Sequence, residues 1–425
     1  MQFPILALAL VLAATTLSAR AQTVGATPAL NLAEALRLAE TAHPAVRARQ
    51  AQLAAAEGVR REASAPFFNN PELSLQRTRR SAEVPDGTSA DWSAGVSQAI
   101  EIGGQQSRRR EAATAALAAL RAEIEDAQRQ ARAEAALRFH VALAAQRRVR
   151  IEERSVELFE GTAQAVNKRR AAGEDTRLDA NVALVEAERA RNALSQAREQ
   201  SIAARGDLAT TLQLPPNALP QLEGDLGLPG TAVAPYELEQ LLSSAQAAPR
   251  QRALEAREAA ARARLATERA SRLPDLVLGL NVGREGPGDA RQRVTTLALS
   301  LPLPLFKRND AAIGQAMTEL TQSELDRATL SRDAVAQVRQ LWSRLNSQTE
   351  RVLRLLRTVA PAATDNQQLA AKSRQAGQIG LLDQLIVNRQ ALDAERDLND
   401  ALADYHATRI ELENAAGWSP EGTAR

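Results

Sequence analysis

Two aspartates stand at equivalent places in the two halves of the chain and are the clearest candidates for chemistry. Asp179 and Asp383 each follow a glycine, Gly173 and Gly377, by six residues. Each acid falls in the first turn of a predicted helix, where a carboxylate interacts favourably with the helix dipole, and Thr176 precedes Asp179 with the spacing of a capping box. Because grouped carboxylates also favour cations, a helix cap and a cation-attracting site are both consistent with this position.

Side chains for other kinds of chemistry are scarce. The three histidines, His43, His140 and His406, are isolated in the sequence, methionine occurs twice and cysteine is absent. No spacing of these residues suits zinc or copper, no disulfide can form, and no nucleophile stands in a pattern with a base. We therefore predict no catalysis, no cofactor and no resident metal ion, and expect the substrate to pass through the protein.

The composition favours helices and gives no sign of nucleic-acid binding. Lys+Arg 53 against Asp+Glu 51 leaves a formal charge of +2, and the charges are interspersed rather than gathered into a patch. Aromatic residues are 3% of the chain and alanine dominates the apolar content, which suits thin, close-packed helices. We predict a mainly helical protein without a nucleic-acid partner.

An internal repeat with an offset of 204 residues organises the chain. Such a register without gaps indicates a duplication, in which each half has a helix, two strands, a long helix, a turn and a returning helix. Seven residues recur at this offset: Arg170, Ala172, Gly173, Leu178, Asp179, Arg205 and Leu208 reappear as Arg374, Ala376, Gly377, Leu382, Asp383, Arg409 and Leu412.

The repeat sets the predicted domain organisation. Asn31 is a plausible N-cap for a first helix that continues to Ala65. Five prolines and three glycines between Leu214 and Tyr236 predict a linker between the repeats. The predicted repeats are 22–213 and 237–418, with strand hairpins at 72–101 and 275–301, long helices at 105–171 and 309–376, returning helices at 176–213 and 381–416, a linker at 214–236 and a tail at 419–425.

The two long helices are too extended for a compact domain. A helix over 105–171 would be roughly 100 Å long at 1.5 Å per residue. Its counterpart over 309–376 has apolar residues at alternating spacings of three and four, which is typical of coiled-coil packing. Pro361 predicts a bend or break in the second long helix, and the first repeat has Glu157 at the equivalent position.

The strands show an apolar side and a small or polar side. Leu73 and Leu75 alternate with polar residues, and the stretches 92–101, 276–283 and 296–301 alternate in the same way. Such strands suit either lipid outside and water inside, or a half-buried hairpin of a soluble domain. The polar segments 79–90 and 284–293 are expected to connect them. Because even the smallest packed barrels use roughly 8 strands, four strands in a membrane require an oligomer.

The N-terminus resembles a secretory signal. An apolar run from Ile5 to Leu12 leads to Ala19-Arg20-Ala21, an A-x-A pattern that predicts cleavage after residue 21. An N-terminal anchor helix is the alternative, although the run is short of the roughly 20 apolar residues that a bilayer requires. A secreted chain of this kind is expected to be periplasmic, extracellular, or inserted in the outer membrane as strands.

The duplicated order of elements and the two tip turns, Ala172 to Thr176 and Ala376 to Gly380, resemble the TolC-type outer-membrane efflux proteins over nearly the whole mature chain. The resemblance implies a homotrimer in which three chains contribute four strands each to a 12-stranded β-barrel in outer-membrane lipid, continued by a long α-helical barrel across the periplasm. It also implies two protein partners, a periplasmic adaptor and a proton-driven pump of the inner membrane.

Two segments resemble the cobalt-zinc-cadmium (CzcC-like) branch of that family, namely Ser97 to Gln105 and Leu301 to Asn309. Each lies where a strand passes into a long helix. Gly103, Gly104, Pro302 and Pro304 allow the sharp change of direction that such a junction needs, and this reading does not involve metal. The branch is expected to have a basic residue after the glycine pair, where this chain has Gln105.

The resemblance also assigns roles at the predicted tips. Asp179 and Asp383 match the family's gate-forming aspartates and would give six carboxylates in a trimer, while a second gate acid is replaced by Val182 and Ile386. Gly173 and Gly377 match the tip glycines that meet the adaptor.

The resemblance implies the outer-membrane channel of a tripartite efflux system of the resistance-nodulation-division type, with divalent heavy-metal cations as cargo. Drugs or secreted polypeptides are the alternative cargo. From a different class, a soluble periplasmic coiled-coil adaptor is the alternative protein, although adaptors have one helical hairpin where this chain has two.

Overall fold

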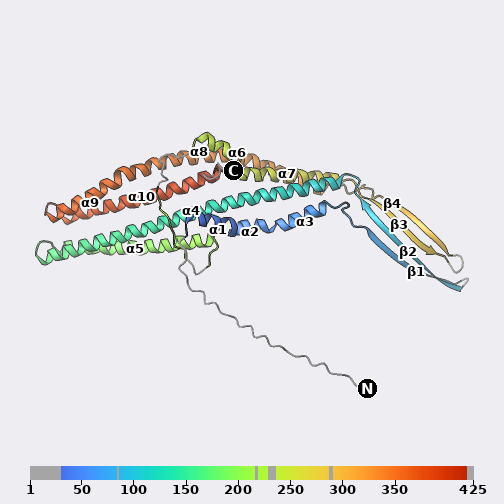
Figure 1. Ribbon diagram of the computed structural model, residues 1–425, viewed down its shortest axis with the longest axis horizontal. Coiled ribbons are helices and arrows are strands. Elements are labelled where there is room, and N and C mark those ends of the chain that lie inside the picture. The colour runs from blue at the N-terminus through green and yellow to red at the C-terminus, as the bar shows by residue number, and fades with distance from the viewer. Residues whose placement is uncertain (1–29, 84–85, 216–218, 228–235, 287–290, 419–425) are drawn as a thin grey trace, which may run out of the picture.

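The computed structural model describes residues 30–83, 86–215, 219–227, 236–286 and 291–418. The chain forms a long rod with paired helices at one end and a narrow sheet at the other (Figure 1). The predicted signal peptide, 1–21, and the predicted tail, 419–425, lie outside the described residues.

The first predicted helix, 31–65, is instead three helices, so that prediction was wrong. Asn31 is the expected N-cap, since its Oδ1 accepts a hydrogen bond of 2.9 Å from the Glu34 amide. The chain breaks at His43 because Pro44 has no amide hydrogen and disfavours helical backbone before it. The three helices are α1 (Leu32–Ala42), α2 (Pro44–Ala51) and α3 (Leu53–Ala63); the second repeat breaks before Pro249, between α6 (Leu238–Gln246) and α7 (Pro249–Ala270).

The long helices form two hairpins that lie side by side (Figure 1). Pro361 interrupts the second of them as expected: a π-helical turn, η2, precedes it, because proline can neither donate to the carbonyl four residues earlier nor pack against it. The first hairpin is α4 (Gln105–Ala171) with α5 (Arg177–Thr211), and the second is α8 (Asp310–Arg354), η2 (Leu355–Val359) and α9 (Ala360–Gln375) with α10 (Leu381–Ala415).

The four strands form one antiparallel sheet in the order β1-β2-β3-β4, which leaves β1 and β4 at its edges. The segment 79–90, predicted as a connection, is mostly strand, and pairing continues to Glu83 opposite Asp86. In the segment 284–293, also predicted as a connection, the strands extend to Glu285 opposite Gln292. Polar composition outside an apolar belt does not prevent backbone pairing, which explains the error. The strands are β1 (Glu72–Glu83), β2 (Asp86–Ile100), β3 (Leu276–Glu285) and β4 (Gln292–Ser300).

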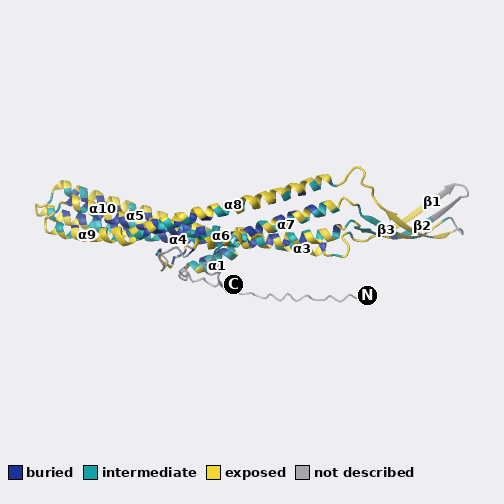
Figure 2. Cartoon of the chain, turned by 90° about the horizontal axis from the view of Figure 1, so that it is seen from above, coloured by how far each residue is buried: buried dark blue, intermediate teal, exposed yellow. Residues whose placement is uncertain are grey.

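The register separates two faces of the sheet, as the alternation predicted. Directly paired residues share a face, so Leu73, Val96, Leu280 and Leu297 form one row of an apolar face. These side chains are more than half exposed in the single chain, as the yellow strands of Figure 2 show. The other face has mostly small and polar residues, with Val277 and Val294 among them: Ser74, Gln76, Ser93, Gly95, Ser97, Gly279, Asn281, Gly283, Thr296 and Ser300.

The hydrophobic core runs along the helices rather than through a globular centre (Figure 2). One cluster lies at the middle of the rod, where Phe139 and Leu143 of α4 pack near the linker residues Leu222 and Leu226. The described part of the linker also pairs with the chain start, through a bridge between Leu30 and Leu222. Among the described residues, no helix combines the length and apolar character needed to cross a bilayer.

Candidate functional site

The two tip turns carry the predicted glycines in left-handed backbone conformation. Gly173 has a φ of 83° and Gly377 a φ of 73°, values that residues with a side chain rarely adopt. Each stops its helix with the same hydrogen bond, from Glu174 N to Arg169 O and from Gln378 N to Ser373 O, both 2.9 Å. The space beside both glycines is open, so a side chain would not clash with any neighbour. Glycine is favoured at these positions by the positive φ of the backbone.

Both candidate gate aspartates cap the returning helices. Asp179 Oδ2 accepts hydrogen bonds from Thr176 N (2.9 Å) and Thr176 Oγ1 (2.6 Å), which lower the pKa of Asp179. Asp383 Oδ2 accepts from Gly380 N at 3.2 Å. The capping role is therefore present at both acids. Since each carboxylate uses Oδ2 for the cap and stays at least partly exposed, it still presents negative charge to solvent.

An ion pair between the hairpins lies beside these caps and was not predicted from the sequence. Asp175, in the first tip turn, accepts a hydrogen bond of 2.8 Å from Arg374 of α9, and Arg169 Nε lies 3.3 Å from its other oxygen. The Asp175 side chain is only 5% exposed. A difference between the repeats could have pointed to this ion pair. The residue equivalent to Asp175 in the second repeat is Ile379, so only the first tip turn has an acid at this position.

Further ion pairs join the hairpins along the tip half of the rod. Glu152 of α4 accepts from Arg396 of α10, with Nη2 to Oε2 at 2.5 Å, and its side chain is 1% exposed. Burial alone would raise the pKa of Glu152, but hydrogen bonds from Arg396 and Arg148 lower it. Glu186 of α5 is held by Arg389 of α10 in the same way. The two hairpins are therefore joined by ion pairs whose carboxylates are shielded from water.

The first strand-to-helix junction contains the predicted glycine pair. Gly104 is the N-cap of α4 with a φ of 74°, and a Cβ at Gly103 would lie 2.8 Å from Leu273 Cβ. Gln105, where the branch is expected to have a basic residue, is 2% exposed and ties the junction together. Its Oε1 accepts from Gly103 N at 2.6 Å and its Nε2 donates to Leu273 O at 2.8 Å. The amide thus joins the junction to the entry of β3.

The second junction uses prolines instead. Residues 301–309, which include Pro302 and Pro304, follow β4 without helix or strand and are largely exposed. Asn309 ends the segment with a φ of 60° and is the N-cap of α8. Its Nδ2 donates to Glu268 O at 2.9 Å, which anchors this junction to α7.

Two of the three histidines are brought together, contrary to their isolation in the sequence. The rings of His140 on α4 and His406 on α10 stack with centroids 4.5 Å apart. His140 Nδ1 lies 2.8 Å from Ala136 O and His406 Nε2 lies 3.0 Å from Gly227 O. Burial lowers the pKa of His140 and takes that of His406 to about 3. Both rings are therefore neutral near pH 7.

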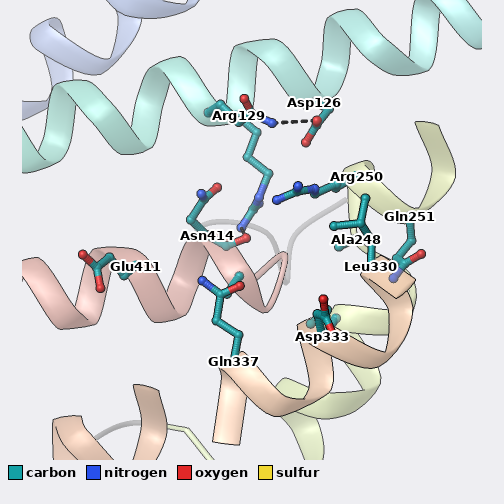
Figure 3. Close-up of a pocket in the computed structure, with 14 residues that line it drawn as sticks. Asp126, Arg129, Ala248, Arg250, Gln251, Leu330, Asp333, Gln337, Glu411 and Asn414 are labelled. Carbon is teal, nitrogen blue, oxygen red and sulfur yellow. Dashed lines mark hydrogen bonds between the residues drawn. The ribbon is translucent and has the colours of Figure 1, made fainter. Parts of the chain in front are cut away.

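A polar cavity of about 360 Å³ lies near this level of the rod, between α4, α7, α8 and α10 (Figure 3). Arg129 and Arg250 point into it, with Asp333 and Gln337 of α8 opposite. Burial lowers the pKa of Arg129 and raises that of Asp126. Across the described ranges, no group of three or more histidines or acids has the arrangement of a metal site.

Comparison with known proteins identifies the family. The family described as outer membrane efflux protein matches residues 35–212 and 241–418, which is most of the chain. The chain belongs to the outer membrane efflux protein family. Each matched segment holds one strand pair and one helical hairpin, so the family match follows the repeat seen in the structure.

Known relatives of this outer membrane efflux protein support the same family assignment. The cobalt-zinc-cadmium resistance protein CzcC of Cupriavidus metallidurans is 30% identical over 354 residues, which covers 79% of this chain and 76% of that protein. Solved structures of outer-membrane proteins share the fold: the channel OprN (TM-score 0.76, 20% identity, 91% of this chain and 90% of that chain), VceC of Vibrio cholerae (0.73, 18%, 92% and 97%) and CusC (0.74, 17%, 91% and 92%).

The predicted family, its CzcC-like resemblance and the fold class are thereby confirmed. The chain is mainly helical and duplicated, with a small β part, and it shares its fold with solved outer-membrane channels. As a member of this efflux family it is located in the outer membrane with its helices in the periplasm, and it is a duct rather than an enzyme.

Proposed function

We propose that this outer-membrane efflux protein is the exit duct of a tripartite system of the resistance-nodulation-division type, and that it releases divalent heavy-metal cations. The observation that carries the cargo is the likeness to CzcC, a protein named for cobalt, zinc and cadmium resistance, over about three quarters of both chains. The tip carboxylates support cation passage, because Asp179 and Asp383 are both at least partly exposed to solvent.

The unpaired strand edges and exposed apolar side chains of the single chain support a homotrimer. The sheet has two open edges, β1 and β4, which lipid does not tolerate. Three copies would pair these edges into twelve strands, enough to close a barrel. The helical edges also expose apolar side chains, with Ile202 of α5 53% and Leu325 of α8 61% exposed, and these are expected to pack between protomers.

The tip is the proposed contact with a periplasmic adaptor and the proposed gate. Asp179 and Asp383 would supply six carboxylates to its mouth, and Gly173 and Gly377 would present open backbone to the adaptor. An inner-membrane, proton-driven pump would load the adaptor and duct. No nucleic acid takes part in this scheme.

A sensitivity assay in the native host tests the proposal. Deletion of the gene is expected to lower the tolerated concentrations of cobalt, zinc or cadmium and to raise cell-associated metal, and plasmid expression should restore both. Hydrophobic drugs serve as the comparison cargo. Sensitivity to drugs alone would favour the multidrug alternative and contradict the metal proposal, and loss of polypeptide secretion alone would favour a type I secretion duct.

A further inference from the structure

The apolar face of the sheet ends in a row of arginines. Register pairs Arg77 with Trp92, Trp92 with Arg284 and Arg284 with Arg293, so one row crosses all four strands. These four side chains share a face because directly opposite residues do. Arg79 lies on the same face, one row farther from the helices. We call Arg77, Trp92, Arg284 and Arg293 the arginine row.

The arginine row marks the outer boundary of the apolar belt. Below it, toward the helices, the face carries exposed Leu73, Leu75, Val96, Leu280 and Leu297. The single amide in the belt, Gln98, is satisfied by carbonyls, since its Nε2 donates to Asn69 O and Ala99 O at 2.8 Å each. From Ile100 to Trp92 the belt extends roughly 26 Å along β2, about the span of a lipid-facing band.

The arginines lack protein counter-charges. Arg77, Arg284 and Arg293 are exposed and make no ion pair with any side chain that the structure describes. On the opposite face, by contrast, Arg80 Nε lies 2.9 Å from Asp91 Oδ2.

The positive charge of the arginine row indicates that an anionic group binds to it. Arginine on a lipid-facing strand is tolerated near the membrane interface, where its head reaches the headgroups, and Trp92 is an interfacial residue type. The helices lie in the periplasm, so the arginine row is at the outer leaflet. Guanidinium groups bind phosphate with short, charge-assisted hydrogen bonds. The three arginines span about 14 Å across the strands, enough for more than one phosphate.

We propose that the arginine row is a binding site for the phosphate-bearing headgroup of an outer-leaflet glycolipid. The proposal rests on the proposed function only in that the sheet is inserted in the membrane as part of a trimer. Each trimer would then carry three such sites, one on each protomer, around the outer rim of the barrel. Bound lipid would fix the height of the barrel in the membrane.

Native mass spectrometry of the purified full-length trimer tests the site. The probes are diphosphorylated lipid A and the same lipid with its phosphates removed. The wild type is expected to prefer the phosphorylated lipid by at least about tenfold, as lost charge-assisted hydrogen bonds imply. The R77Q/R284Q/R293Q variant should lose this preference, R77K/R284K/R293K should keep part of it, and R80Q, on the opposite face, should keep all of it.

Equal binding of the two lipids by the wild type would overturn the proposal, even if the glutamine variant failed to fold. So would displacement of lipid A by inorganic phosphate at the same concentration, or full binding by a folded glutamine variant. Ion conduction by the same preparation separates the two claims. A conducting trimer without phosphate preference contradicts only this site, whereas a protein that never inserts contradicts the proposed function.

Discussion

Arg374 of the second hairpin donates a hydrogen bond of 2.8 Å to Asp175 of the first, so the periplasmic tips are joined within one protomer. The carboxylate is 5% exposed and is also approached by Arg169. A buried carboxylate that loses its partner is strongly unfavourable. This pair therefore holds the two hairpins together at their tips.

Replacing Arg374 with alanine is expected to loosen the tip. Removing one partner of a buried ion pair costs about 3 to 5 kcal/mol when the other charge is left unpaired, and Arg169 beside Asp175 should keep the cost below that range. The contact between the hairpins is nevertheless lost, so they should separate more often and the channel should conduct more. The measurement is the open probability of single channels in planar bilayers.

Arg170 provides the matched control for this change. It occupies the position equivalent to Arg374 in the first repeat, yet it is exposed and forms no ion pair within the described residues. Arg170→Ala should leave the open probability unchanged. An unaltered channel in Arg374→Ala would contradict the role of the pair.

The tip glycines should be sensitive to bulk although no atom lies near them. Gly173→Trp or Gly377→Trp forces a residue with a side chain into positive φ, which costs roughly 1 to 2 kcal/mol. Either change also places a large side chain where the adaptor is proposed to dock. We expect intact trimers on gels and loss of metal resistance. Gly161→Trp is the control, because that glycine is equally open but lies within α4. Normal resistance in the tip variants would refute the docking role.

The buried charge between the hairpins should support stability in a pH-dependent way. Glu152→Gln is expected to lower the melting temperature of the trimer, since Arg396 and Arg148 lose their buried carboxylate and keep only the exposed Asp393 and Asp400, at a cost of up to about 3 kcal/mol. The pKa of Glu152 is lowered in the folded state. Its contribution is therefore complete above about pH 4.5 and is lost as the pH falls through the folded pKa.

Glu153 is the control for Glu152. Its pair with Arg198 is about half exposed on both sides, so Glu153→Gln should change stability by less than about 1 kcal/mol. Equal effects of the two substitutions would show that burial of the pair does not matter.

The fold could be predicted to a large extent because its signals are local. The duplication, the absence of proline and the turn glycines gave the bounds of α4, and Pro361 gave the interruption before α9. The strand lengths were underestimated because polar residues beyond the apolar belt still pair. The break at Pro44 was missed because the helical composition continues through it.

The site was harder to predict because its decisive contacts join distant residues. Asp175 and Arg374 are both ordinary charged residues of a helix end, and only the packing of the hairpins makes them partners. His140 and His406 meet because α4 and α10 pack together at that level. The capping of α5 by Thr176 and Asp179, in contrast, is a local contact and was predicted from their spacing.

The stacked histidines should make the protein less stable in acid. The pKa of His406 is about 3 in the folded state, below the ordinary value of 6.5, because of burial with His140 and Arg409 nearby. Between those values the unfolded chain binds more protons, so stability falls by up to about 1.4 kcal/mol per pH unit as the pH drops below 6.5. The melting temperature of His406→Gln should depend less on pH over this window. A variant with the wild-type slope would exclude the histidine as the cause.

The most direct measurement of the central claim is the ion selectivity of the reconstituted full-length protein. If three chains form a duct whose mouth is lined by Asp179 and Asp383, single channels in planar bilayers should prefer potassium over chloride under a salt gradient. The double variant D179N/D383N should still form channels, but its ratio of potassium to chloride permeability should shift toward one. A wild-type channel that prefers anions, or a double variant with unchanged selectivity, would contradict the account.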